Sequence, residues 1–154
     1  MENAIIIYAS THHGNTRKLV EAIAETYHIP LIDATQQKQA DLSGYDLIGF
    51  ASGIDFGRFY APVETFLQDN LPEGKQVFFL YTCARPGNRF TQTIQAEARK
   101  KNARILGEYG CRGYNTYGPW KWIGGMNRNH PSQQELQQAL HFFASLQETK
   151  KSDL

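Results

Sequence analysis

The sequence predicts an α/β fold: a doubly wound, five-stranded parallel sheet with helices on both faces. Two observations predict it. Apolar runs of strand length alternate five times with segments that have helical apolar spacing. The run at 4–9 is apolar throughout, and that at 76–82 has apolar residues on both faces, as expected for strands covered on both sides. A chain of 154 residues suits one domain, which we expect to span 1–154.

The first half of the chain sets one edge of this sheet. The first strand, Ala4–Ala9, leads through a polar loop to a helix over about 15–27. The second strand, about 28–32, contains Pro30, which cannot donate to a ladder, so it is expected at an edge. A third strand over 46–52 is followed by a Gly-bearing aromatic loop at 53–60 and then by a helix with Pro62 in its first turn.

The second half supplies the other edge. A strand at 76–82, a loop at 83–89, a helix at 90–101 and a more polar strand at 104–111 follow in order. The stretch 112–131 is irregular and rich in Gly and aromatics, and the last helix opens with the capping box Ser132–Glu135. These features agree with strand order 2-1-3-4-5, in which the loops after the first, third and fourth strands meet at the carboxyl edge of the sheet.

Composition excludes several classes of protein. No apolar run reaches the roughly 18 residues of a membrane span, and the N-terminus lacks a basic leader, so we expect a cytoplasmic chain without membrane contact. The net charge of +1 and the lack of a long basic stripe argue against nucleic-acid binding. Cys83 and Cys111 form no C-x-x-C pair and are expected to be reduced, and the scattered histidines predict no metal site.

The first loop, Ser10–Thr16, is a candidate phosphate site. A strand, a polar loop with Gly and a helix start together aim backbone N–H groups and the positive end of the helix dipole at one point. Thr11 and Thr16 add hydroxyl donors, and Gly14 lacks the Cβ that would block close approach. The alternative is an ordinary turn whose polar side chains cap the helix.

With these three loops in view, the chain resembles the flavodoxin family over almost its whole length. The family's phosphate loop reads T-x-T-G-N-T, and Thr11-His12-His13-Gly14-Asn15-Thr16 matches it except at His13. The resemblance implies an FMN cofactor. It implies contacts from Ser10, Thr11, His12, His13, Gly14, Asn15 and Thr16 in the first loop, from Ser52, Gly53, Ile54, Asp55, Phe56 and Gly57 in the second, and from Thr82, Cys83, Ala84, Arg85 and Gly87 in the third.

The second and third loops differ in how well they fit this family. Phe56-Gly57 is similar to a pair found in the family, in which an aromatic residue stacks on the flavin and the peptide bond of the following glycine flips on reduction. The alternative is that Phe56 packs within the loop. Phe59 and Tyr60 are expected to pack under the loop. The third loop has no stacking aromatic before Phe90, which leaves Arg85, Trp120 or Trp122 as candidates to cover the other ring face.

The leading functional hypothesis is an FMN-binding electron carrier that shuttles electrons between redox partner proteins, with no catalytic side chain. The alternatives are an FMN-dependent oxidoreductase acting on a quinone or other small substrate, and a flavin-free binding domain of the same fold. Typical flavodoxins are strongly acidic. This near-neutral chain places His12, His13, Arg58, Arg85 and Arg89 in or beside the site loops. We therefore expect the reduction potential of the hydroquinone couple to be less negative than in acidic flavodoxins. If either histidine pairs with the phosphate, FMN should bind more tightly at low pH.

Overall fold

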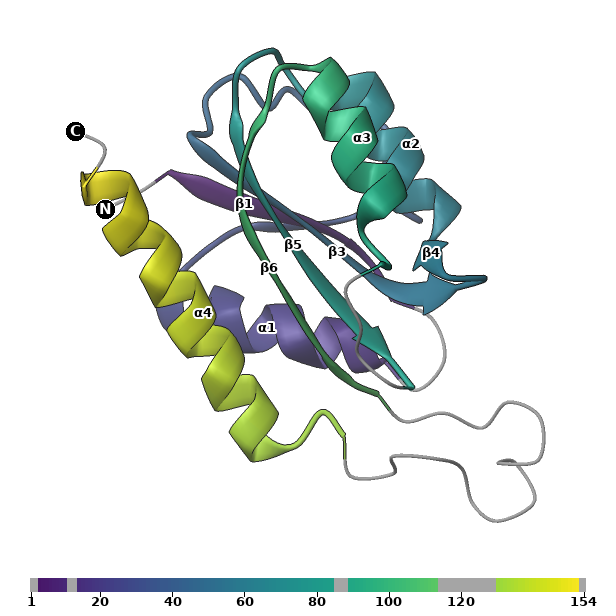
Figure 1. The fold of residues 1–154 in the computed structure, drawn as a ribbon, viewed down its shortest axis with the longest axis vertical. Coiled ribbons are helices and arrows are strands. Elements are labelled where there is room, and N and C mark those ends of the chain that lie inside the picture. Colours follow the sequence, from purple (N-terminus) through teal and green to yellow (C-terminus); the bar gives the residue numbers. More distant parts are fainter. Residues whose placement is uncertain (1–2, 11–13, 85–88, 114–129, 153–154) are drawn as a thin grey trace.

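Parallel strands form the centre of the fold, with helices packed on both faces (Figure 1). The computed structural model describes residues 3–10, 14–84, 89–113 and 130–152, with side chains as far as Glu148. The strands are β1 Ala4–Ala9, β2 Leu31–Asp33, β3 Leu47–Asp55, β4 Arg58–Phe59, β5 Gln76–Cys83 and β6 Arg104–Arg112. The helices are α1 Asn15–Tyr27, α2 Ala61–Asn70, α3 Gln92–Lys100 and α4 Gln133–Ser152.

The order of the parallel strands is β2-β1-β3-β5-β6, which confirms the predicted topology. β2 begins directly after Pro30 and lies at one edge, and β6 lies at the other. In the registers, Ala9 pairs with Ser52 and Gly53 pairs with Thr82, so β1, β3 and β5 end side by side. This alignment brings the three candidate loops to the same edge of the sheet.

Each face of the sheet has its own apolar core. α1 and α4 cover one face, where Leu19 and Ile23 of α1 and Phe143 of α4 are buried with Phe78 of β5 (Figure 1). α2 and α3 cover the other face, whose core contains these buried aromatics: Phe50, Phe59, Phe66 and Phe79. Burying each such ring contributes roughly 1.5–3 kcal/mol, and coverage on both faces explains why the strand sequences do not alternate.

The second candidate loop differs from the sequence prediction. β3 does not end at Ser52 but continues to Asp55, and the chain then returns as β4, antiparallel to β3. Gly53, Ile54 and Asp55 are therefore strand residues, and only Phe56 and Gly57 form the turn. The described sheet thus has a short sixth strand that the sequence reading did not include.

The capping box predicted before the last helix is confirmed. The Glu135 N–H donates to Ser132 Oγ at 3.2 Å, and the Ser132 N–H donates to Glu135 Oε1 at 3.0 Å. These reciprocal bonds satisfy two backbone donors at the start of α4. Glu135 Oε2 also accepts the N–H of Arg112 at 2.9 Å, so the same carboxylate ties the helix to the end of β6.

Candidate functional site

The first loop leads into α1 through Gly14, which is partly buried. Gly14 has φ 65° and ψ 31°, and among the described residues, its chain neighbours aside, no atom lies within 4 Å of where its Cβ would stand. The N–H of Arg17 donates to Ser10 Oγ at 3.1 Å, so Ser10 caps the first helical turn. The open approach to Gly14 and the positive end of the helix dipole fit an anionic group. Thr11, His12 and His13 lie outside the described residues.

The hydroxyl of Thr16 is engaged inside the protein. Thr16 Oγ1 and Thr82 Oγ1 lie 2.9 Å apart, and both residues are buried. The pair joins the first turn of α1 to the end of β5, so it connects the first and third candidate loops. Thr16 was expected to offer a hydroxyl to phosphate, whereas here the hydroxyl already has a partner within the fold.

The second loop is a tight hairpin turn. Phe56 has φ 51° and Gly57 has φ 78°, the signs that a two-residue type I′ turn requires. Gly57 tolerates this conformation because it has no Cβ, whereas Phe56 adopts it at a steric cost. The Phe56 side chain is 98% exposed. The packing alternative for Phe56 is therefore not realised, and its ring is free to cover a ligand.

Phe59, by contrast, packs under the loop as expected. Its ring is 2% exposed, with its centroid 6.1 Å from the ring of Phe79 and 6.4 Å from that of Tyr81. Ser52 Oγ accepts the Tyr60 N–H at 2.8 Å, and a Cβ on Gly53 would stand 2.4 Å from the Tyr60 hydroxyl. Ser52 and Gly53 thus secure the base of the hairpin.

Arg58, one of the basic residues expected in or beside the site loops, is paired with a carboxylate. Its guanidinium makes a two-pronged contact with Glu64 in the first turn of α2, including Nε to Oε1 at 3.1 Å. The hydrogen bond and the charge of Glu64 raise the pKa of Arg58. The Glu64 side chain is only 6% exposed, so its charge is compensated mainly by Arg58.

The third loop is described only in part. Cys83 and Ala84 follow Thr82 at the carboxyl end of β5, while Arg85 and Gly87 lie outside the described residues, as do Trp120 and Trp122. Cys83 and Cys111 are not joined in a disulfide. Thr82, not Cys83, pairs in register with Cys111, so the two thiols point to opposite faces of the sheet, and burial raises the pKa of Cys111.

Gly113, in the Gly- and aromatic-rich stretch 112–131, was not among the residues expected to contact FMN, but it lies beside the candidate site. Its N–H donates to the carbonyl of Cys83 at 2.9 Å, and a Cβ at this position would stand 2.6 Å from Asn15 Nδ2. The end of β6 therefore packs directly against both the phosphate-loop helix and the third loop. Its sequence signal was a glycine in an irregular stretch, two residues after the expected strand at 104–111, which is too common to single out.

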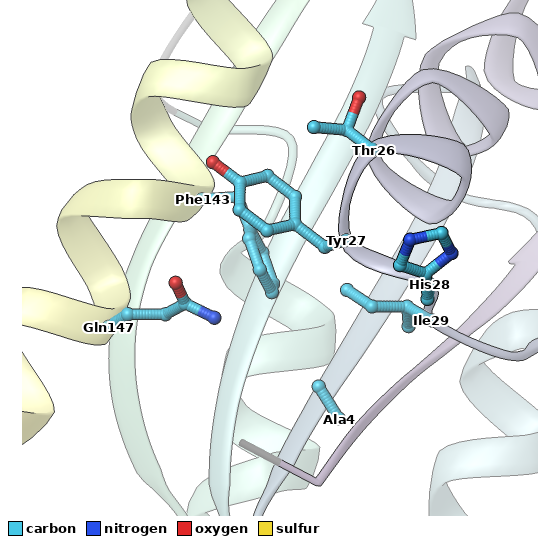
Figure 2. A pocket seen from close by; sticks show the side chains of 7 residues that line it. All are labelled: Ala4, Thr26, Tyr27, His28, Ile29, Phe143 and Gln147. Atoms are coloured by element: carbon cyan, nitrogen blue, oxygen red, sulfur yellow. The ribbon is translucent and has the colours of Figure 1, made fainter. Parts of the chain in front are cut away.

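The described residues include no group of three or more His, Cys, Asp or Glu side chains placed to hold a metal ion. A cavity of about 150 Å³ lies at the opposite end of the sheet, between the end of α1 and the middle of α4 (Figure 2). Tyr27, Phe143 and Gln147 line it, and it is separate from the three loops.

None of the described helices is both long and apolar enough to cross a membrane.

Comparison with known proteins agrees with this geometry. Residues 5–120 match the family model described as a flavodoxin domain. An uncharacterized protein of Methanocaldococcus jannaschii is 34% identical over 145 residues, covering 93% of this chain and 97% of that protein.

Solved structures show the same fold. A flavodoxin, WrbA-like protein from Agrobacterium tumefaciens superposes with a TM-score of 0.69 at 18% identity, covering 99% of both chains. A flavoprotein from Lactobacillus acidophilus, solved in complex with FMN, gives a TM-score of 0.56 at 16% identity, covering 71% of this chain and 93% of that one. With three quarters of its length matched by the family model, the chain belongs to the flavodoxin domain family.

Proposed function

We propose that this protein binds FMN at the carboxyl edge of its sheet and carries electrons between redox partner proteins. The observation that supports this best is the pairing of two features at one edge. α1 begins at the sterically open Gly14, and an exposed aromatic, Phe56, stands on a tight turn. The first suits an anionic phosphate, and the second suits a flat, apolar ring.

The described residues fit FMN in distinct roles. The amino end of α1, with Gly14 and Asn15, would hold the phosphate, and Phe56 would cover one face of the ring. Gly57, at φ 78°, is free of the Cβ that would hinder a change of its peptide orientation. The flavin itself would supply the reversible uptake of one or two electrons.

Two pairs of polar side chains around this edge are engaged within the fold, which is compatible with the proposed electron carrier. The hydroxyls of Thr16 and Thr82 are bonded to each other, and Glu64 is paired with Arg58. These groups are used to hold the fold together, so they are poor candidates for a general base or a nucleophile. Binding and orienting the cofactor is the task that remains for the described residues.

The first experiment is to purify the protein and record its visible spectrum before and after adding FMN. We expect absorption bands near roughly 375 and 450 nm, because oxidised flavin imposes these bands whatever the protein. Titration of the apoprotein should quench FMN fluorescence with one equivalent bound. A colourless protein that takes up no FMN would contradict the proposal.

A second experiment separates a carrier from an enzyme. The chemically reduced holoprotein should pass electrons to a one-electron acceptor such as a cytochrome c. It should show no catalytic turnover of a quinone with nicotinamide donors. Sustained quinone turnover would instead support an FMN-dependent oxidoreductase.

A further inference from the structure

The hairpin that carries Phe56 and Gly57 is fixed on both sides of its turn. Asp55 pairs with Arg58 in the β3–β4 register, and Tyr60 bonds to Ser52 at the base. In addition to these contacts, Phe59 shares a buried apolar cluster with Val63 and Phe66 of α2, and the ion pair of Arg58 with Glu64 ties the returning strand to the same helix. Arg58 is the residue directly after Gly57, so this ion pair acts immediately beside the turn.

The charges around Arg58 are arranged so that its own charge is compensated. Glu64 is buried and lies in the first turn of α2, where the helix dipole also favours an anion. Glu97 of α3 adds a weaker attraction for Arg58, while itself bonding Lys100 at 3.0 Å. Arg58 is half-exposed, so without Glu64 it would present a largely unpaired cation next to the turn.

Building on the FMN site proposed above, we propose that Glu64 is a positioning residue for this site. Acting through Arg58, it holds the hairpin that presents Phe56 and Gly57, and it cancels the positive charge of Arg58 beside the flavin. The contact of Glu64 is with Arg58, the residue that follows the turn. Its effect on the flavin is therefore transmitted through the guanidinium and the β4 backbone.

The two parts of this role have separable consequences. Loss of the anchor loosens the hairpin whatever the charge. Loss of the negative charge leaves Arg58 to stabilise reduced flavin, which carries an additional negative charge, and so makes the reduction potential more positive. Single and double variants that change the charge at Arg58 and Glu64 distinguish the anchoring role from the charge role.

The experiment compares four variants with the unaltered protein. E64Q removes the charge and weakens the anchor, and R58Q/E64Q removes both partners. R58K keeps the positive charge but lacks the planar fork needed for a two-pronged contact. E73Q is the matched control, because it changes net charge as E64Q does, but at Glu73, an exposed partner of Asn102 beyond the other end of α2.

Amide hydrogen exchange on the apoproteins tests the anchor. In E64Q, R58K and R58Q/E64Q we expect the amides of Arg58 and Tyr60 to exchange at least tenfold faster, with those of central β5 unchanged. E73Q should match the unaltered protein. Unchanged exchange in both E64Q and R58K would overturn the anchoring role, and R58K keeps this test available even if E64Q folds poorly.

Redox titration of the FMN-loaded proteins tests the charge effect. In E64Q we expect the preference for reduced over oxidised FMN to rise about tenfold, which is a shift of about +30 mV for a two-electron couple. R58K, R58Q/E64Q and E73Q should lie close to the unaltered protein. An E64Q potential that does not move would overturn the charge role. Failure of the unaltered protein to bind FMN would instead refute the proposed function, and the exchange data would still decide the anchor.

Discussion

Thr16 Oγ1 and Thr82 Oγ1 lie 2.9 Å apart in the protein interior, although the two residues are 66 positions apart in sequence. Thr16 is in the first turn of α1, and Thr82 is next to last in β5. Their hydrogen bond fixes the start of the phosphate-loop helix relative to the third loop. The geometry of the candidate site therefore depends on a contact within the core.

Replacing one member of this pair should destabilise the fold. T82V keeps the shape of the side chain but leaves the buried Thr16 hydroxyl without its partner, at a cost of about 1–3 kcal/mol. T16V/T82V should cost less than the sum of the two single variants, because neither hydroxyl is then left alone. Urea unfolding measures all three variants. Strictly additive losses would show that the two hydroxyls do not interact.

Gly113→Ala should disturb the site from the end of β6. Its Cβ would stand 2.6 Å from Asn15 Nδ2 and 2.9 Å from Asn15 Cγ, so the Asn15 side chain must move. We expect weaker FMN binding, measured by fluorescence titration, and a stability loss of about 1–3 kcal/mol from overpacking. Gly44→Ala is the matched control, because nothing lies within 4 Å of its Cβ position. Equal FMN affinity in both variants would contradict the close contact seen here.

Phe56→Ala should weaken FMN binding without weakening the fold. The ring is 98% exposed in the protein alone, so its removal loses almost no burial. A stacking contact is worth about 0.5–1.5 kcal/mol beyond area burial, which predicts a rise in Kd of up to about tenfold. Phe59→Ala is the contrast: its ring is buried, so unfolding should become easier by about 3–5 kcal/mol. An unchanged Kd in Phe56→Ala would remove Phe56 from the site.

Glu135 should make stability depend on pH in the acid range. Burial alone would raise the pKa of its carboxyl, but hydrogen bonds from His130, Ser132 and Arg112 outweigh this and hold the pKa below its ordinary value. The folded protein therefore favours the ionised form. Its stabilising contribution is fully present above the ordinary glutamate pKa and is lost as the pH falls through the lower folded value.

The variant E135Q tests this dependence. At pH 7 we expect a loss of about 1 kcal/mol, the usual value of a helix cap, and a smaller loss relative to the unaltered protein at pH 3. Urea unfolding at the two pH values gives both numbers. E148Q, at an exposed position on the same helix, should show little loss at either pH. A loss in E135Q that is the same at both pH values would argue that the ionised carboxylate has no special role.

The short β3–β4 hairpin shows where reading the sequence fell short. A two-residue strand such as Arg58–Phe59 has no measurable period, and Phe56-Gly57 is not among the usual Asn-Gly or Asp-Gly signals of a type I′ turn. The turn is stabilised by its surroundings. Phe59 is buried against β5, and Arg58 is held by a helix that begins only later in the chain. Sequence reading therefore predicted a loop at the right place but not its shape.

The sequence by itself determined what rests on local order. The alternation of strands and helices, the edge position after Pro30 and the capping box of Ser132 and Glu135 all depend on residues close together in the chain, where spacing and backbone chemistry are sufficient. Only the tertiary structure decided which polar groups already have partners: Thr16 bonds to Thr82, and Arg58 pairs with Glu64. It also decided that Gly113 lies close against the Asn15 side chain. The contacts of Thr16 with Thr82 and of Gly113 with Asn15 join elements distant in the chain, so these partners become known only once the sheet has set which residues meet. Arg58 and Glu64 are six residues apart, and their contact depends on how the hairpin leads into α2.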